Sequence, residues 1–242
     1  MATKKESDEQ VKKLEIGHRW KTIRLEIEGI SPLAMQNRPE STMDNLRRKD
    51  NGLPKRDYKS TDWRRFIDSI HWIDDNIKPD TLDDDITEEE YQEQFIKLVK
   101  ESKDTGNPLF YIPSEALKES ICIGAYRNGV VKNTKVARGL FMILGDKTPF
   151  TFDNVEMEVV PTINQNSPSR PMVMSVYSKF TNWKAELLIS YNETFLSPDT
   201  LMAMIELAGK SVGVLARRLD KPFGKYGAFK VAKVTTGIAT TM

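Results

Sequence analysis

The stretch SPDTLMAMIELAGKSVGVLARRLDKPFGKYGAFKVAKV, residues 197–234, contains a helix start, a glycine-rich loop and a strand in direct succession. Ser197 is a good N-cap, and Pro198 stands at the first helical position, where its missing N–H costs nothing. The helical spacing of the apolar residues that follow predicts a helix ending at Gly209: Leu201, Met204, Ile205 and Ala208. A basic segment with glycines at 209, 213, 224 and 227 follows. We expect residues 228–234 to form a final strand.

Alternation of apolar and polar residues predicts strands upstream of this stretch. In 21–29 the apolar Ile23, Leu25 and Ile27 alternate with charged residues, which is typical of a half-buried strand. Pro32 ends the pattern because proline cannot donate to a strand ladder. Further strands are expected at 110–113, at 149–160 with a break at 153–154, at 173–180 and at 183–191.

Three more helices are expected. The first covers 61–77. The second follows Thr87, which forms a capping-box pattern with Glu90, and it would present Tyr91, Phe95, Leu98 and Val99. The third covers 114–127 and closes at Asn128-Gly129, whereas 135–144 fits either a helix or a strand.

Three segments lack periodicity. Residues 1–17 are polar and are expected to form a frayed arm or a short helix. Residues 36–60 are expected to form a long functional or disordered loop, and 161–171 form a loop rich in Pro, Asn and Ser.

The order of these elements predicts an α+β fold of the ferredoxin-like (RRM-like) kind, an antiparallel sheet with helices on one face and a long inserted loop and helical region. We expect an N-terminal arm at 1–20 and a single domain over 21–242, with the insertion at about 34–105.

The charges are unevenly distributed along the chain. The 242 residues include 36 Lys+Arg and 35 Asp+Glu, so the net charge is only +1. Residues 80–104 hold ten acidic and three basic residues, 209–242 hold seven basic and one acidic, and 38–65 hold nine basic and five acidic. The near-neutral total therefore hides one acidic and two basic segments, and distribution rather than sum decides what a surface attracts.

Basic side chains on loops suit contact with a line of phosphates, and glycines let the main chain approach them. Nearby aromatic rings, Phe223 and Tyr58 among them, suit stacking on bases. The candidate nucleic-acid-binding residues are Lys210, Arg217, Arg218, Lys221, Lys225, Tyr226, Arg38, Arg47, Arg48, Lys55, Arg56, Trp63, Lys135, Arg138 and Arg170. The alternative is that these loops are merely solvated.

The acidic segment 80–93 is open to several interpretations. It is a solvated helix face, a surface that repels nucleic acid or docks on a basic surface of a neighbouring copy, or a metal-binding segment. Asp83-Asp84-Asp85 lacks the glycine and the 12-residue spacing of an EF-hand loop.

Several function classes are disfavoured. The single Cys122 excludes a disulfide framework, and with only His18 and His71 there is little for a histidine-based metal site or proton relay. No apolar run is long enough to span a membrane, and the charged N-terminus does not resemble a signal peptide. No nucleophile elbow, Walker loop or dinucleotide-binding motif is present. We therefore expect a cytoplasmic protein with no catalytic residues, metal, cofactor or membrane partner.

The chain resembles a known family in four places: the Ile30-Ser31-Pro32-Leu33 end of the first strand, the Tyr111-Ile112-Pro113-Ser114 strand-to-helix entry, the strand at 180–189, and the helix running into Ala208-Gly209 and then Phe223-Gly224-Lys225-Tyr226-Gly227. Together these are similar to the RAMP superfamily, the ferredoxin-like proteins that include the backbone subunits of CRISPR effector complexes, or to a phage-encoded relative. The resemblance implies a single-stranded nucleic-acid binder that lines up side by side along the strand, with 36–60 as a thumb.

The resulting hypothesis is a non-catalytic protein that binds single-stranded nucleic acid and other copies of itself, as a head-to-tail oligomer or filament. A metal-independent endoribonuclease of the same superfamily is one alternative. A structural protein, such as a phage assembly component without nucleic acid, is the other.

Overall fold

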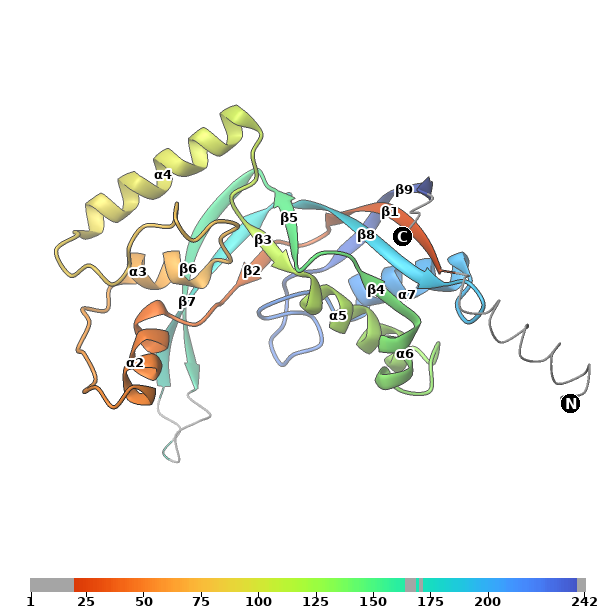
Figure 1. The fold of residues 1–242 in the computed structure, drawn as a ribbon, viewed down its shortest axis with the longest axis horizontal. Helices are drawn as coiled ribbons and strands as arrows, with labels where there is room; N and C mark the ends of the chain where they lie inside the picture. Colours follow the sequence, from red (N-terminus) through yellow and green to blue (C-terminus); the bar gives the residue numbers. More distant parts are fainter. Residues whose placement is uncertain (1–19, 164–168, 170–171, 239–242) are drawn as a thin grey trace, which may run out of the picture.

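A computed structural model describes residues 20–163, 169 and 172–238 of the chain. The predicted N-terminal arm at 1–20 therefore lies outside the described residues except for Trp20. The main sheet has the strand order β3-β5-β8-β1-β9, and β4 also pairs with β8 (Figure 1). These strands span β1 Trp20–Gly29, β3 Tyr111–Pro113, β4 Phe141–Ile143, β5 Lys147–Thr151, β8 Lys184–Asn192 and β9 Phe229–Ile238.

The connectivity of the main sheet is that of a ferredoxin-like fold. Strand β1 leads through helix α5 (Ser114–Arg127) to β4 and β5, and β8 leads through helix α7 (Pro198–Ser211) to β9. Strand β1 lies between β8 and β9, and both pairings are antiparallel. Strands β4 and β5 pair antiparallel with successive parts of β8. The α+β fold class predicted from the sequence is therefore confirmed.

Helix α7 packs against α5 and β9 so closely that two glycines have no room for a side chain. A Cβ on Gly124 would lie 2.7 Å from the Cα of Ala208. A Cβ on Gly209 would lie 1.9 Å from the backbone oxygen of Phe229 on β9. The prediction that this helix ends at Gly209 is wrong: α7 continues to Ser211, and Gly209 serves close packing inside the helix.

The insertion and a later hairpin of two strands together build a second lobe on a second sheet, with the strand order β2-β7-β6. Its strands are β2 Leu33–Met35, β6 Asn154–Ile163 and β7 Met172–Thr181, and its helices are α2 Glu40–Asp50, α3 Asp62–Ser69 and α4 Glu88–Thr105. Figure 1 shows this lobe beside the main sheet, with β6 and β7 reaching down to the level of α2.

The prediction of a loop over 36–60 is wrong at α2. This helix has no buried residue, so no apolar stripe marks it in the sequence. The amide of Asn45 donates to the Arg56 oxygen at 3.0 Å, and the Tyr58 hydroxyl donates to Asp44 at 2.5 Å. These bonds hold the segment after α2 against the helix.

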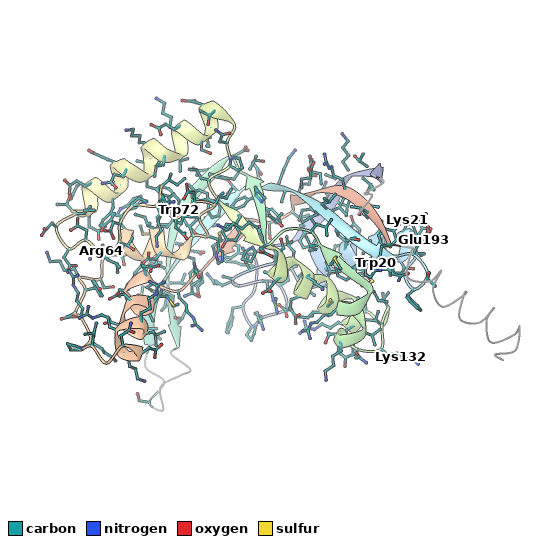
Figure 2. All side chains as sticks on the ribbon, viewed as in Figure 1. Trp20, Lys21, Arg64, Trp72, Lys132 and Glu193 are labelled. Carbon is teal, nitrogen blue, oxygen red and sulfur yellow. The ribbon has the colours of Figure 1, made fainter. Side chains whose placement is uncertain are left out.

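The helix predicted at 61–77 is too long. It ends at Ser69, because Ile70 is extended and the chain turns to bring Trp72 into a bridge with Phe110. The Trp72 indole donates to the Ile67 oxygen at 3.0 Å, which fixes this exit; Figure 2 labels Trp72 within the lobe.

Other local predictions are confirmed. The capping box of Thr87 and Glu90 opens α4, and Gly106 closes it in a left-handed conformation. The ambiguous segment at 135–144 contains helix α6 (Thr134–Leu140) followed directly by β4.

Strand β5 ends at Thr151 and β6 begins at Asn154, so the break lies one residue earlier than the predicted 153–154. The prediction of a loop at 161–171 is wrong at its start, because β6 continues to Ile163.

One hydrophobic core runs through both lobes. Phe110 is fully buried at the junction, with its ring centroid 4.9 Å from Trp72 and 5.5 Å from Phe180. No helix in the described part of the chain is long and apolar enough to cross a membrane.

Candidate nucleic-acid interface

The basic glycine-rich segment between α7 and β9, residues 212–228, is an ordered loop; we call it the basic loop. Its backbone is hydrogen-bonded to the start of the insertion: Ala216 N donates to the Ala34 oxygen at 3.0 Å, and Gly227 N donates to the Pro32 oxygen at 2.8 Å. Within the loop, Val214 N donates to the Gly227 oxygen at 3.0 Å. The loop is thus fixed at the junction of the two lobes.

Left-handed backbone is concentrated in the basic loop. Gly213 and Gly227 have φ of 73° and 72°, and a Cβ on Gly227 would lie 2.1 Å from the Val214 oxygen. Three residues with side chains also have positive φ: Leu215 at 66°, Arg217 at 50° and Phe223 at 60°. Such conformations are uncommon for bulky residues and are often retained where a function requires them.

Glu158 on β6 is the carboxylate on which the loop's side chains converge. Its Oε1 accepts from the Tyr226 hydroxyl at 2.8 Å and lies 3.5 Å from Arg217 Nη1 and 3.8 Å from Lys225 Nζ. The Arg217 guanidinium lies over the Tyr226 ring at 5.4 Å and over the Tyr177 ring at 5.7 Å. Sequence reasoning missed Glu158, because it lies 59 residues before Arg217 in the chain and only the fold brings it there.

Tyr226 is only 5% exposed, and its hydroxyl is bound to Glu158. The ring lies beside the Arg217 and Lys225 cations, at 5.4 and 5.0 Å. Stacking of Tyr226 on a base, which the sequence suggested, therefore requires these side chains to move first.

The other cations of this region differ in whether a carboxylate of the protein binds them. Arg218 is bound to the buried Asp220 at 2.6 Å, and Asp220 also lies 3.4 Å from Arg127. Lys210 pairs with Glu206 at 3.0 Å on the surface of α7. Lys221 is exposed, and no described residue binds its side chain. Arg218 is thus held as a structural residue, whereas Lys221 and Lys225 extend into solvent.

The candidate cations of the insertion lie just before, on and after α2. Arg47 pairs with Glu40 at 3.1 Å, and Arg48 Nε donates to the Pro54 oxygen at 2.8 Å. Arg56 lies over the Tyr58 ring at 4.8 Å and 3.6 Å from Asp84. Arg38 and Lys55 are exposed.

A third group lies on α6. Lys135 is exposed, and Arg138 forms an ion pair with Glu119 of α5 at 2.6 Å. Lys132, which the sequence interpretation did not single out, is exposed just before α6, and Figure 2 labels it at the lower edge of the molecule. Arg170 lies outside the described residues.

These three groups share one side of the molecule. In Figure 1, α2, the basic loop and α6 lie along the lower side, whereas the acidic helix α4 lies along the upper side. The fold therefore brings basic residues from segments up to about 180 positions apart to one side, which the sequence alone does not show.

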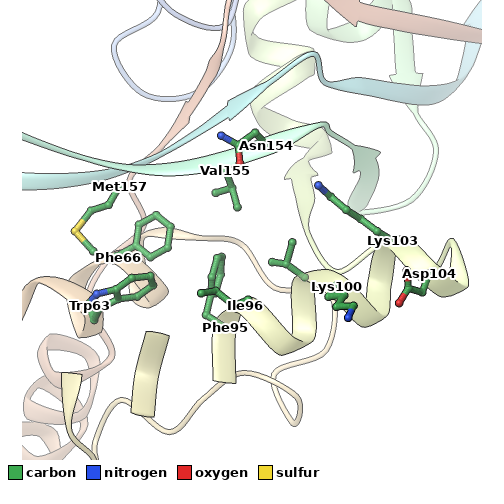
Figure 3. A pocket seen from close by; sticks show the side chains of 11 residues that line it. Trp63, Phe66, Phe95, Ile96, Lys100, Lys103, Asp104, Asn154, Val155 and Met157 are labelled. Carbon is green, nitrogen blue, oxygen red and sulfur yellow. The ribbon is translucent and has the colours of Figure 1, made fainter. Parts of the chain in front are cut away.

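Trp63 lies elsewhere. It packs edge-on against Phe66, with centroids 5.2 Å apart, and lines a cavity of about 470 Å³ between α3, α4 and β6 (Figure 3). Val155 and Met157 of β6 close the cavity, whereas Glu158 takes part in the cluster of the basic loop. Successive strand residues point to opposite faces, so Trp63 and the basic loop lie on opposite faces of the β6–β7 sheet.

Burial changes the pKa of His71 and of Cys122. Burial lowers the pKa of His71, and burial raises the pKa of the Cys122 thiol to about 11. His18 lies outside the described residues. The described part of the chain contains no cluster of His, Cys, Asp and Glu that could hold a metal ion.

The fold and this surface define a ferredoxin-like α+β protein with a basic loop at the junction of two lobes. No protein-family model and no curated protein matches the chain. One similar solved structure is the type III-B Cmr-beta complex bound to cognate target RNA, with a TM-score of 0.47 and 10% identity over 96% of this chain. The chain spans 65% of the length of that neighbour. A second is Cmr6 from Pyrococcus furiosus, with a TM-score of 0.30 and 11% identity over 88% of this chain and 98% of that one.

Both likenesses have TM-scores below 0.5 and sequence identities of 10% and 11%, so they assign no family to the chain. Likeness at this level assigns no function to the chain. The function is therefore proposed from the chain's own residues.

Proposed function

We propose that this chain is a non-catalytic protein that binds single-stranded nucleic acid and assembles side by side with other copies along the strand. The observation that carries the proposal is the shared lower side of α2, the basic loop and α6, with cations from all three elements. A strand that crosses this side would meet Lys55, Lys221, Lys225 and Lys135 in solvent-exposed positions.

The ion pairs on this side are compatible with phosphate binding. Most of them are exposed, and exposed pairs are worth about 0–1 kcal/mol. A phosphate competes with the carboxylates of Glu40 and Glu119 for Arg47 and Arg138 at little cost. Arg218 is the exception, since its partner Asp220 is only 1% exposed.

The test is the salt dependence of binding to labelled single-stranded DNA and RNA. We expect affinity to fall linearly with salt on logarithmic axes, with a slope of about −0.7 for each phosphate that the protein neutralises. The triple variant Lys135→Gln, Lys221→Gln, Lys225→Gln should weaken binding and reduce the magnitude of the slope by about 2.

The control removes two positive charges from the opposite side: Lys97→Gln with Lys100→Gln on α4. It should bind nearly as the parent protein does. A slope near zero, or equal losses in both variants, would rule out a phosphate interface on the lower side. Cleavage of the labelled RNA would instead favour the endoribonuclease alternative.

A further inference from the structure

The cavity lined by α3, α4 and β6 lies on the face of the β6–β7 sheet that is opposite to the basic loop. Its volume of about 470 Å³ falls within the range of small-molecule sites, which is about 300–1,000 Å³. Most of its lining is apolar, with Trp63, Phe66 and Phe95 from the helices and Val155 and Met157 from β6 (Figure 3). The proposed nucleic-acid interface makes no use of this cavity, so its ligand has to be inferred from its own lining.

Helix α4 is fixed on both sides of the cavity, which keeps the space between them open. On one side, Tyr91 and Phe95 are the buried residues of the helix. On the other side, the Lys103 ammonium donates to the Asp153 oxygen and ties the C-terminal half of the helix to the start of β6. Between these contacts, Ile96 at the mouth of the cavity is 55% exposed. The cavity is therefore preformed, which lowers the cost of filling it.

The charged side chains at the rim give the cavity a net positive charge. They are Lys100, Lys103 and Asp104, so two cations face one acid. Lys100 is exposed, and none of the described residues forms an ion pair or a hydrogen bond with its ammonium. Lys103 is bound to a backbone oxygen, which does not neutralise its charge. An apolar cavity with an uncompensated cation at its rim is complementary to a ligand with an apolar body and one anionic group.

The surrounding charges favour a small anion over a strand of nucleic acid. At physiological salt a single carboxylate responds mainly to charges within about 8 Å, which at this cavity are those of the rim. A strand extends beyond the rim and meets the N-terminal half of α4, where Glu89 and Glu93 are exposed. The segment 80–104 has a net charge of −7, so it repels a line of phosphates.

We propose that this cavity binds a small apolar carboxylate. The carboxylate pairs with Lys100 at the rim, and the apolar body lies against Trp63, Phe66 and Phe95. Trp63, which the sequence suggested as a ring for stacking on a base, thus contacts a different class of ligand. The site is separate from the nucleic-acid interface and does not depend on the proposed function.

The test compares three probes that share one alkyl chain and differ in the head group: decanoate, decanol and decylammonium. Calorimetric titration of the full chain should give saturable binding of decanoate, weaker binding of decanol and the weakest binding of decylammonium. From octanoate to decanoate the affinity should rise about fourfold for each added methylene. Decanoate should also change the tryptophan fluorescence, and Trp63→Phe should remove most of that change.

Two variants separate the head-group contact from the apolar one. Lys100→Gln should weaken decanoate about two- to fivefold, as expected for an exposed charge pair, and leave decanol unchanged. Its matched control is Lys97→Gln, one turn earlier on α4, where Lys97 lies 3.9 Å from Glu101 and outside the cavity lining. Val155→Phe fills part of the cavity without changing charge, so it should weaken decanoate and decanol alike. The urea midpoint of each variant checks that it folds.

Four results would overturn the site as proposed. They are no saturable binding of decanoate, decanol bound as tightly as decanoate, equal losses in Lys97→Gln and Lys100→Gln, and release of bound decanoate by a short oligonucleotide. The last result would assign the cavity to nucleic acid. Binding of decanoate by a protein that binds no nucleic acid would leave the site standing and remove only the proposed function.

Discussion

Glu158 shows how much a single residue controls at the candidate interface. Its carboxylate lies within 4 Å of the cations of Arg217 and Lys225, two of the residues proposed to contact phosphate. Its second oxygen, Oε2, is buried and has no hydrogen-bond partner among the described residues. Glu158 is therefore the internal counter-ion of these two cations.

Glu158→Gln should tighten binding of single-stranded nucleic acid several-fold. The amide oxygen still accepts from Tyr226, but Arg217 and Lys225 lose their internal counter-ion and become free for phosphates. The salt dependence should steepen by about 0.7 for each additional phosphate that these cations neutralise, as measured by fluorescence anisotropy over a salt series.

Glu186→Gln is the control for this prediction, because it changes the net charge equally. Glu186 pairs with Arg24 at 3.4 Å on the main sheet, away from the basic loop. If both variants tightened binding equally, the effect would come from net charge and Glu158 would have no special position.

At the scale of elements, two glycines inside helices differ in whether a side chain would fit at their position. Gly209 lies inside α7 against β9, where a Cβ would overlap the Phe229 oxygen at 1.9 Å. Gly139 lies inside α6, where a Cβ would meet nothing within 4 Å. Glycine therefore allows the close packing of α7, whereas in α6 it only lowers the stability of the helix.

Alanine substitutions at these glycines should change stability in opposite directions. Gly209→Ala should destabilise the protein by about 1–3 kcal/mol, the usual cost of overpacking, despite the better helix propensity of alanine. Gly139→Ala should stabilise it by about 0.5–1 kcal/mol. Urea unfolding of both variants measures this directly, and a stabilised Gly209→Ala would contradict the close approach of α7 and β9.

Elements with a periodic apolar face were predictable from the sequence, and elements without one were not. Strand β1 and the capping box of α4 follow from alternation and from the Thr87–Glu90 pair. Helix α2 has no buried residue, so its formation depends on contacts with 51–61 and leaves no periodic signal. The end of α3 at Ser69 was also hidden, because Trp72 leaves the helix to pair with Phe110, 38 residues away.

At the scale of the whole molecule, the two lobes share one core. The centroid of the Phe110 ring lies within 6.4 Å of four other ring centroids. Two of these rings belong to the insertion, Trp72 and Phe95, and two to strands β5 and β7, Phe150 and Phe180. The insertion is thus anchored through packing as well as through the β6–β7 hairpin.

The protein should therefore unfold in one cooperative transition. Hydrogen exchange of α4 in the insertion and of α5 in the main lobe should report the same midpoint in urea. Phe110→Ala should lower both midpoints together, at a cost of about 3–5 kcal/mol. Separate midpoints for α4 and α5 would show that the lobes fold independently.

The sequence by itself determined the fold class, the periodic helices and strands and the uneven distribution of charge, because these depend on neighbours within a few residues or on composition. Only the tertiary structure decided that α2, the basic loop and α6 share one side, that Glu158 neutralises Arg217 and Lys225, and that Trp63 lies with an apolar cavity on the opposite face. These relations join residues tens to hundreds of positions apart. Packing of the whole chain creates them, and no local pattern encodes them.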